Sequence, residues 1–242
     1  MQVLVLGSTG QTGYQVVKQL LENDIPVKTI ARTTDKFASF DKNGNLQVIK
    51  ASILDMADNS LKEILADIDF TICCLGHNIS LKGIWGKPHF LVTEALKKIH
   101  LNTDNKGQTK KLILMSTTAC LNDDKQERFS FGEEIVMGIM RCLLPPQRDN
   151  EEAVKFLKSI DQGDHRLEWI AVRPDTLVAE EQVTNYEIFE SPQKSPVFNA
   201  GKTSRINVAH FMMQLVCNDE LWTGWKYKMP VIYNVKEQTP DQ

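Results

Sequence analysis

Apolar positions along the chain fall into short unbroken runs that alternate with longer segments of helical periodicity. The short runs predict strands at Val3–Leu6, Val27–Ala31, Leu46–Ile49, Phe70–Leu75, Lys111–Ser116 and Glu168–Val172. Unbroken apolar runs, unlike alternating ones, are typical of strands that are covered on both faces. Strands that alternate with helices in this way indicate a parallel α/β sheet.

The helical segments complete this pattern. We predict helices over Thr12–Asn23, Ser60–Leu65, Pro88–His100, Asn150–Ile160 and Val208–Cys217. In the first of them, Val16, Val17, Leu20 and Leu21 form one apolar stripe. Because no repeat, low-complexity segment or domain boundary interrupts residues 1–242, we expect a single, doubly wound α/β domain. A small C-terminal region is expected on its substrate side.

Three irregular stretches break the alternation: residues 77–87, 121–148 and 179–203. Each follows the carboxyl end of a predicted strand, and open α/β sheets bind their ligands at that edge. We therefore expect these stretches to form the substrate pocket. Trp85, Phe129 and Phe131 are candidates to stack on a planar substrate, although aromatic residues at such positions also serve as core or lid packing.

A glycine-rich segment, GSTGQTG at residues 7–13, lies between the first strand and the first helix. Gly7 permits a sharp turn off the strand. Gly10 lets the backbone approach a pyrophosphate, and Gly13 lets the helix pack closely on the sheet. The positive end of the helix dipole then meets the phosphate charge. A glycine loop in this setting predicts a dinucleotide-binding Rossmann domain.

The second strand indicates which dinucleotide is bound. NAD-binding domains usually place an acidic residue at its end, where it holds the ribose hydroxyls. Here the strand ends in Arg32, and Lys36 follows closely. A guanidinium can bind a 2′-phosphate through two charge-assisted hydrogen bonds, so we expect NADP(H) as the cofactor. Topology also places Ser52 and Ile53 near the adenine, and Leu75 and Gly76 near the nicotinamide half.

Composition and charge narrow the class of partner. The formal net charge of −3 offers no electrostatic reason to expect nucleic acid or an anionic membrane as partners. Met1 leads directly into the first strand, so we expect no signal peptide and a cytoplasmic protein. The five cysteines form no CxxC motif and no cluster with histidine, and we predict no metal site. The oligomeric state is left open.

Several short segments together resemble a known family. GSTGQTG at 7–13, ART at 31–33, CCLG at 73–76, LMSTTA at 114–119, VRP at 172–174 and SRINVAHFM at 204–212 follow the order of atypical short-chain dehydrogenases/reductases. The resemblance is nearest to the biliverdin reductase B/flavin reductase branch, and looser to NmrA-like NAD(P)-binding proteins.

The resemblance implies a role for particular residues. It places Gly7, Thr9, Gly10, Gln11, Thr12 and Gly13 along the pyrophosphate, with Arg32 and Lys36 at the 2′-phosphate. Leu75 and Gly76 would lie near the nicotinamide ribose, and Pro174 would supply backbone beneath the nicotinamide ring. Ser116 and Thr117 match the position of a catalytic or cofactor-orienting hydroxyl.

The chain also departs from the family pattern. Classical members of the family protonate their substrate through a Tyr-x-x-x-Lys pair. The one such spacing here, Tyr14 to Lys18, lies in the first helix beside the glycine loop, and we interpret it as coincidence. Residues 145–150, where the pair should fall, contain neither tyrosine nor lysine, and Asp175 follows Pro174 where the biliverdin reductase branch has histidine. His77 is expected to be a surface loop residue, the alternative being an approach to the nicotinamide.

These departures favour one function over another. Hydride transfer to a flavin, quinone or bilin depends more on positioning than on a dedicated acid. The first hypothesis is therefore an NADPH-dependent oxidoreductase of a small conjugated acceptor. The second is an NmrA-like protein that binds NADP(H) and reports its state to a partner without turnover. An isomerase or epimerase is a third class.

Overall fold

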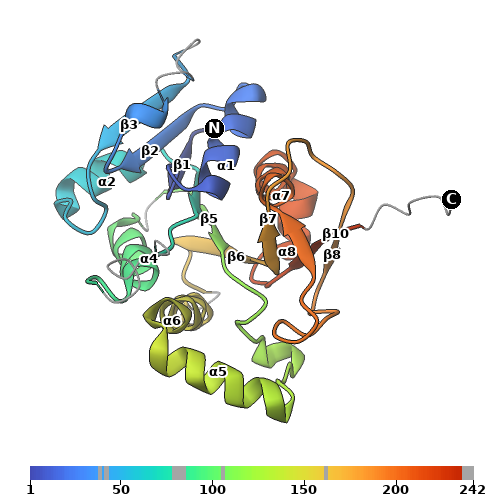
Figure 1. Cartoon of the computed structure of the whole chain (residues 1–242). Coiled ribbons are helices and arrows are strands. Elements are labelled where there is room, and N and C mark those ends of the chain that lie inside the picture. Colours follow the sequence, from blue (N-terminus) through green and yellow to red (C-terminus); the bar gives the residue numbers. More distant parts are fainter. Residues whose placement is uncertain (38–39, 41–43, 78–85, 105–106, 161–162, 236–242) are drawn as a thin grey trace, which may run out of the picture.

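The computed structural model describes residues 1–37, 40, 44–77, 86–104, 107–160 and 163–235 (Figure 1). Its main feature is an eight-stranded sheet in the order β3-β2-β1-β4-β5-β6-β10-β8. The strands of this sheet are β1 (Val3–Leu6), β2 (Val27–Ala31), β3 (Leu46–Lys50), β4 (Phe70–Cys73), β5 (Lys110–Met115), β6 (Leu167–Pro174), β8 (Tyr186–Phe189) and β10 (Val231–Asn234). All neighbours pair in parallel except β10 and β8, and a separate parallel pair consists of β7 (Thr176–Val178) and β9 (Lys202–Ser204).

Helices cover both faces of the sheet. The helices are α1 (Gln11–Glu22), α2 (Asp58–Ala66), α4 (Leu91–Asn102), α5 (Phe131–Leu143), α6 (Pro145–Ser159), α7 (Arg205–Cys217) and α8 (Asp219–Trp225). Two short 3-10 turns, η1 (Asp35–Phe37) and η2 (Asp123–Lys125), lie in loops. α1, α7 and α8 pack on one face, and α2, α4 and α6 on the other.

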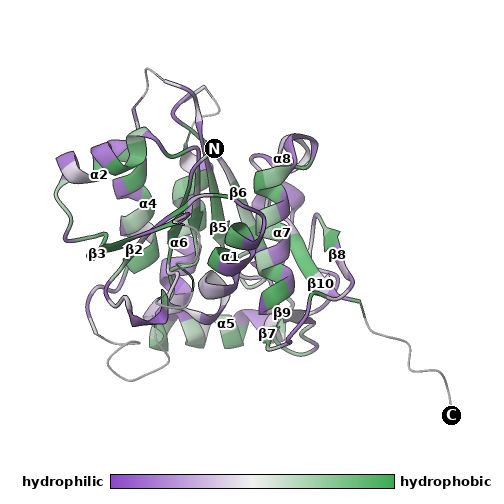
Figure 2. Ribbon diagram, turned by 90° about the horizontal axis from the view of Figure 1, so that it is seen from above, coloured by the Kyte–Doolittle hydropathy of each residue, from purple (hydrophilic) through white to green (hydrophobic). Residues whose placement is uncertain are grey.

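The two apolar cores follow from the pleat of the strands. In β1, Val3 and Val5 point to the core beneath α1 and α7, while Leu4 and Leu6 point to the core beneath α2 and α4. All four side chains are fully buried, as the unbroken apolar run predicts. Figure 2 shows the same arrangement, with hydrophobic residues concentrated in the strands and polar residues on the outer sides of the helices.

The α/β fold class predicted from the sequence is confirmed. The strand order reverses between β1 and β4, so the chain runs outward through β2 and β3 on one side and through β5 and β6 on the other. This is the topological switch point at which doubly wound sheets bind dinucleotides. The predicted strands and helices all occur, with ends that differ by a few residues. The largest difference is at the start of α6, which begins at Pro145 and not at Asn150. Proline is well suited to the first turn of a helix.

The helix α5 was not predicted from the apolar pattern, because apolar residues also lie on its exposed face and no clear apolar stripe marks a buried one. Phe131, Ile135, Ile139 and Leu143 follow one another at four-residue spacing and are all more than half exposed. The helix begins with a capping box, in which Ser130 and Glu133 bind each other's backbone N–H groups, and it packs on the outer side of α6 (Figure 1). Among the described residues no helix is both long and apolar enough to cross a membrane.

The C-terminal region completes the sheet beyond β6. Its strands β7 to β10 were not predicted, since each has only three or four residues. Arg173, fully buried in β6, holds this region to the sheet. Its guanidinium donates to Glu127 at 2.6 and 2.9 Å, to the Glu190 carbonyl at 3.1 Å and to the Met229 carbonyl at 2.8 Å. Three chain segments that follow β5, β8 and α8 are therefore joined at one side chain.

Candidate functional site

The glycine loop joins β1 to α1 at the switch point, and packing against neighbouring backbone requires two of its glycines. Gly7 has φ of +73°, and a Cβ there would overlap the carbonyl group of Cys74 at the end of β4. A Cβ on Gly13 would overlap the Gly7 carbonyl oxygen, so this glycine allows α1 to approach the loop closely. Both observations agree with the roles expected from the sequence.

Gly10 has a different environment. A Cβ there would touch only the Gly7 carbonyl oxygen, at 3.1 Å, and would otherwise point into open space. Gly10 is also the N-cap of α1, which has no side-chain cap and no acidic residue in its first turn. The first N–H groups of α1 therefore face a space that an anion can enter. The loop fits the pyrophosphate of a dinucleotide.

The other loop residues differ in exposure. Thr12 is buried, Thr9 is half-buried, and Gln11 is exposed beside a cleft of about 480 Å³ that Gly10 and Lys36 also line. Ser8, which was not predicted to have a role, is buried and shares a short hydrogen bond with Thr29 of β2. This bond fixes the position of the loop on the sheet.

Two cations follow the end of β2. Lys36 in η1 donates from Nζ to the carbonyl oxygen of Thr9, at 2.8 Å, which brings its charge to the glycine loop. Arg32 is exposed, and in the described part of the chain its guanidinium has no hydrogen-bond or ion-pair partner. After β3, Ser52 is half-buried and its carbonyl accepts from Asp55 and Met56, while Ile53 is packed in the core. The structure thus leaves Arg32 available to a ligand at this end of the loop.

The ends of β4, β5 and β6 lie side by side beyond the loop. Ser116 N donates to the Val172 carbonyl at 2.8 Å, and Thr118 N donates to the Pro174 carbonyl at 3.2 Å. Leu75 and Gly76 follow β4, which pairs with both β1 and β5. The predicted nicotinamide-side residues are therefore neighbours on one edge of the sheet.

The two predicted hydroxyl groups are not equivalent. Ser116 Oγ is buried beside the Cys120 thiol. Thr117 is half-buried, and its Oγ1 accepts a hydrogen bond from Ala119 N at 3.3 Å. Since a hydroxyl must reach the cofactor or acceptor to act on it, Thr117 is the better placed of the two.

Asp175 adds a carboxyl group at the end of β6. Its Oδ2 accepts from Gly201 N at 2.8 Å, and the hydroxyl of buried Thr118 lies beside it. Burial raises the pKa of Asp175 above the ordinary value for an aspartate, although these hydrogen bonds and the charge of Lys194 oppose the shift. This group stands where the related branch has histidine, and it tightens the connection of β6 to β9.

His77 does not lie on the surface as expected. Its side chain is only 5 % exposed, and Nε2 lies 3.0 Å from Oδ2 of Asp149, which is fully buried near the start of α6. Asp149 lies 72 residues further along the chain, before the helix expected at Asn150–Ile160, so no sequence signal joined it to His77. The stacking candidate Trp85 lies outside the described residues. Of the other two, Phe131 is exposed on α5, and Phe129 is half-buried with the Arg141 guanidinium over its ring.

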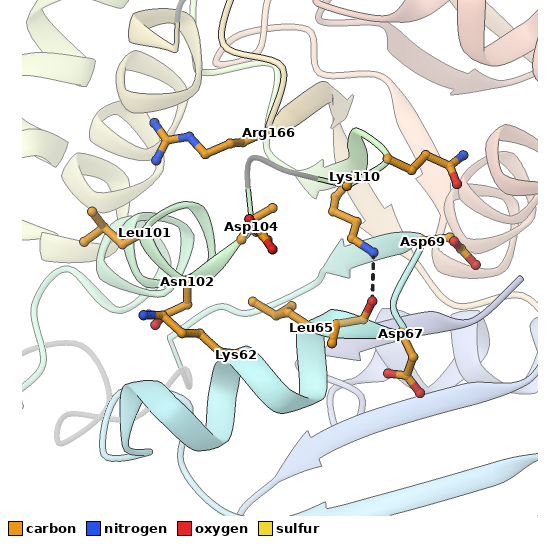
Figure 3. Close-up of a pocket in the computed structure, with 13 residues that line it drawn as sticks. Lys62, Leu65, Asp67, Asp69, Leu101, Asn102, Asp104, Lys110 and Arg166 are labelled. Carbon is orange, nitrogen blue, oxygen red and sulfur yellow. Dashed lines mark hydrogen bonds between the residues drawn. The ribbon is translucent and has the colours of Figure 1, made fainter.

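A larger cleft, of about 800 Å³, lies elsewhere. Figure 3 shows it between the end of α2, the end of α4 and the amino ends of β4 and β5, with Lys110 donating to the Ala66 carbonyl at 3.2 Å. Its charged residues are mixed in sign, with Lys62, Lys110 and Arg166 beside Asp67 and Asp69. It lies at the opposite edge of the sheet from the glycine loop, so size alone does not identify the site.

Comparison with known proteins agrees with the geometry of the glycine loop. A family model described as NAD(P)H-binding matches residues 7–219, from the first glycine of the loop to the start of α8. The chain belongs to this NAD(P)H-binding family. This match confirms the NAD(P)-binding family that the order of the sequence motifs indicates.

Solved structures share the fold of this NAD(P)H-binding protein at low sequence identity. An anaerobillin reductase from Escherichia coli O157:H7 is 15 % identical, with a TM-score of 0.68 over 99 % of this chain and 100 % of that one. A short-chain dehydrogenase/reductase from Veillonella parvula in complex with NADP is 13 % identical, with a TM-score of 0.69 over 96 % and 94 %. An oxidoreductase from Lactococcus lactis is 19 % identical, with a TM-score of 0.69 over 98 % and 92 %. At these identities the likeness shows the fold.

A curated relative matches over a shorter stretch. An uncharacterised chloroplastic protein of Arabidopsis thaliana is 36 % identical over 76 residues, which is 31 % of this chain and 27 % of that protein. The matched stretch spans about a quarter of the length of the plant protein.

Proposed function

We propose that this protein is an NADPH-dependent reductase that transfers hydride to a small conjugated acceptor such as a flavin, quinone or bilin. The observation that carries the choice of NADPH is the pair of cations after β2. Lys36 is tied to the glycine loop through the Thr9 carbonyl, and exposed Arg32 lies where an acidic residue would hold NAD. The structural neighbour named as an anaerobillin reductase supports a reductase, and the one in complex with NADP supports this cofactor.

The choice of acceptor class rests on the nicotinamide edge. The start of α6 holds Asp149 where a Tyr-x-x-x-Lys pair would fall, so alcohol chemistry lacks its usual acid. A conjugated acceptor does not need that pair, because hydride transfer to it depends first on positioning, and a weaker acid elsewhere in the site is enough to protonate its reduced form. The direct test is NADPH oxidation by the purified protein against a panel of flavins, quinones and bilins. No turnover on any of them, with tight NADPH binding, would favour the second candidate, an NADP(H) sensor of the NmrA-like kind.

Arg32→Asp should change the cofactor preference. A charge-assisted hydrogen bond contributes about 1.5–3 kcal/mol, which corresponds to roughly ten- to a hundred-fold in affinity. The new carboxylate repels the 2′-phosphate and accepts from the ribose hydroxyls of NADH, so the preference should move from NADPH towards NADH. Dissociation constants for both cofactors measure the effect, and Lys36→Ala should weaken NADPH to a smaller extent.

The control for this prediction is Lys62→Asp, which makes the same change of net charge on exposed α2, beside the cleft at the opposite edge. Its cofactor affinities should equal those of the parent. If the parent binds NADH as tightly as NADPH, then Arg32 is only a solvated turn residue and the choice of NADPH fails.

Thr117→Val should slow turnover more than Tyr14→Phe. Thr117 lies at the nicotinamide edge, and loss of one hydrogen bond of about 0.5–1.5 kcal/mol corresponds to roughly two- to ten-fold in rate. Tyr14 lies in α1, with its ring packed 4.8 Å from that of Phe40, and its hydroxyl should not affect turnover. Steady-state kcat for the two variants gives the ranking, and the opposite ranking would contradict the proposed position of the nicotinamide.

A further inference from the structure

A buried histidine–aspartate pair lies at the edge of the sheet where the proposed cofactor site ends. Asp149 is fully buried, and the side chain of His77 is 5 % exposed. The Nε2 to Oδ2 distance of 3.0 Å is that of a well-formed hydrogen bond. Buried polar pairs of this kind either stabilise a fold or prepare a group for chemistry, and their position distinguishes the two.

Asp149 is held from several sides. Its carboxylate accepts from Val92 N at 2.8 Å, from Thr93 N at 3.0 Å and from Thr93 Oγ1 at 2.7 Å, all in the first turn of α4. Burial by itself would raise the pKa of Asp149, but the hydrogen bonds from His77, Thr93 and Val92 outweigh it and lower the pKa. The carboxylate therefore stays ionised, and it orients the imidazole with a proton on Nε2.

The position of His77 relates the pair to the proposed reaction. His77 directly follows Gly76, just beyond β4, and β4 pairs with β1 on one side and with β5 on the other. The glycine loop continues β1, and Ser116 and Thr117 continue β5. Asp149 belongs to the first turns of α6, within residues 145–150, where the family resemblance places the Tyr-x-x-x-Lys pair. The pair therefore occupies the side of the site that lacks an acid.

We propose that His77 is the residue that protonates the acceptor, and that Asp149 positions it. The inference rests on the proposed function. NADPH supplies two electrons and one hydrogen nucleus to the acceptor as hydride and leaves as NADP⁺. The imidazolium of His77 breaks one N–H bond and gives that proton to the acceptor atom that has gained negative charge, forming an O–H or N–H bond. Solvent returns the proton to His77, so NADPH, acceptor and one proton become NADP⁺ and the two-electron-reduced acceptor.

His77→Gln tests this role, because glutamine retains a hydrogen-bond donor for Asp149 but cannot act as the acid. Loss of a general acid lowers turnover by about 10²–10⁴-fold. We expect that loss in kcat with the best acceptor of the panel, with the NADPH dissociation constant unchanged within a few-fold. His77→Ala should regain part of its activity when imidazole is added to the buffer, which a purely structural histidine would not show. His165→Gln, on an exposed residue just before β6 at the opposite edge, is the matched control.

A second readout does not depend on turnover. The imidazole resonances of histidine-labelled protein, with His77 assigned by its loss in His77→Gln, should shift when NADP⁺ and then an unreactive acceptor analogue are added. Unchanged His77 resonances, or a kcat of His77→Gln within a few-fold of the parent, would overturn this inference while leaving the proposed function intact. A parent that reduces no acceptor would overturn the proposed function, and this inference with it.

Discussion

Gly10→Val is expected to lower NADPH affinity by about 10²–10⁴-fold while the protein stays folded. The Cβ of Gly10 would point into the space in front of the first turn of α1, where the pyrophosphate should lie. A branched side chain there separates the phosphates from the helix N–H groups. Loss of two charge-assisted hydrogen bonds, at about 1.5–3 kcal/mol each, gives an affinity loss of this size. Calorimetric titration with NADPH measures the loss.

Substitutions at Gly10 and Gly13 should distinguish a loss of cofactor binding from a loss of stability. Gly10→Ala leaves its Cβ 3.1 Å from the Gly7 carbonyl oxygen, a tight contact that a small shift can relieve, and should lower affinity less than valine. Gly13→Ala would overlap backbone atoms of Gly7 and should lower the melting temperature itself. A folded Gly10→Val protein with the affinity of the parent would show that the phosphates do not cross this loop.

Glu127→Ala should lower the free energy of unfolding by about 3–5 kcal/mol, because it leaves the buried guanidinium of Arg173 without its carboxylate. The remaining hydrogen bonds, to the carbonyls of Met229, Cys120 and Glu190, do not neutralise the charge. Urea denaturation followed by circular dichroism measures the difference. Exposed Glu181→Ala removes the same type of side chain with no such partner in the described ranges and should stay near the parent.

The stability contributed by this ion pair should depend on pH. Burial alone would raise the pKa of Glu127, but the hydrogen bonds and charge of Arg173 outweigh it and lower the pKa below the ordinary 4.5. A carboxylate with a lowered pKa in the folded state stabilises the fold above its unfolded-state pKa, and this contribution fades as the pH falls towards its folded-state pKa. The gap in unfolding free energy between the parent and Glu127→Gln should therefore narrow below about pH 4.5. A gap that is constant from neutral pH downwards would contradict the assignment.

The proposed nucleotide half of the site could be located from the sequence because its residues are close together along the chain. The glycine loop is one run of residues between one strand and one helix, and Arg32 follows the next strand directly. Spacing along the chain fixes their positions in space once the parallel α/β pattern is recognised. The structure adds that packing requires Gly7 and Gly13, whereas Gly10 faces open space.

The remainder of the site depends on contacts between distant segments. His77 and Asp149 are separated by 72 residues that include α4, β5, η2 and α5, and each alone has the sequence context of a loop residue. Arg173 was expected only as part of a motif, and its burial follows from Glu127, which arrives from the irregular segment after β5. Short strands such as β7 and β9 carry too few residues for periodicity to reveal them. Such pairings follow from tertiary structure and have no signature along the chain.

The place of β10 in the sheet has a consequence for synthesis of the chain on the ribosome. β8 is complete before β10 is made, yet β10 is its neighbour and lies between it and β6. Until β10 emerges, β8 is a strand with unpaired N–H and C=O groups, and such edges pair readily with other chains. Premature release after α8 would therefore leave this edge open, so truncated chains should be directed to aggregation and degradation. The glycine loop and strands β1 to β6 can already have formed by then.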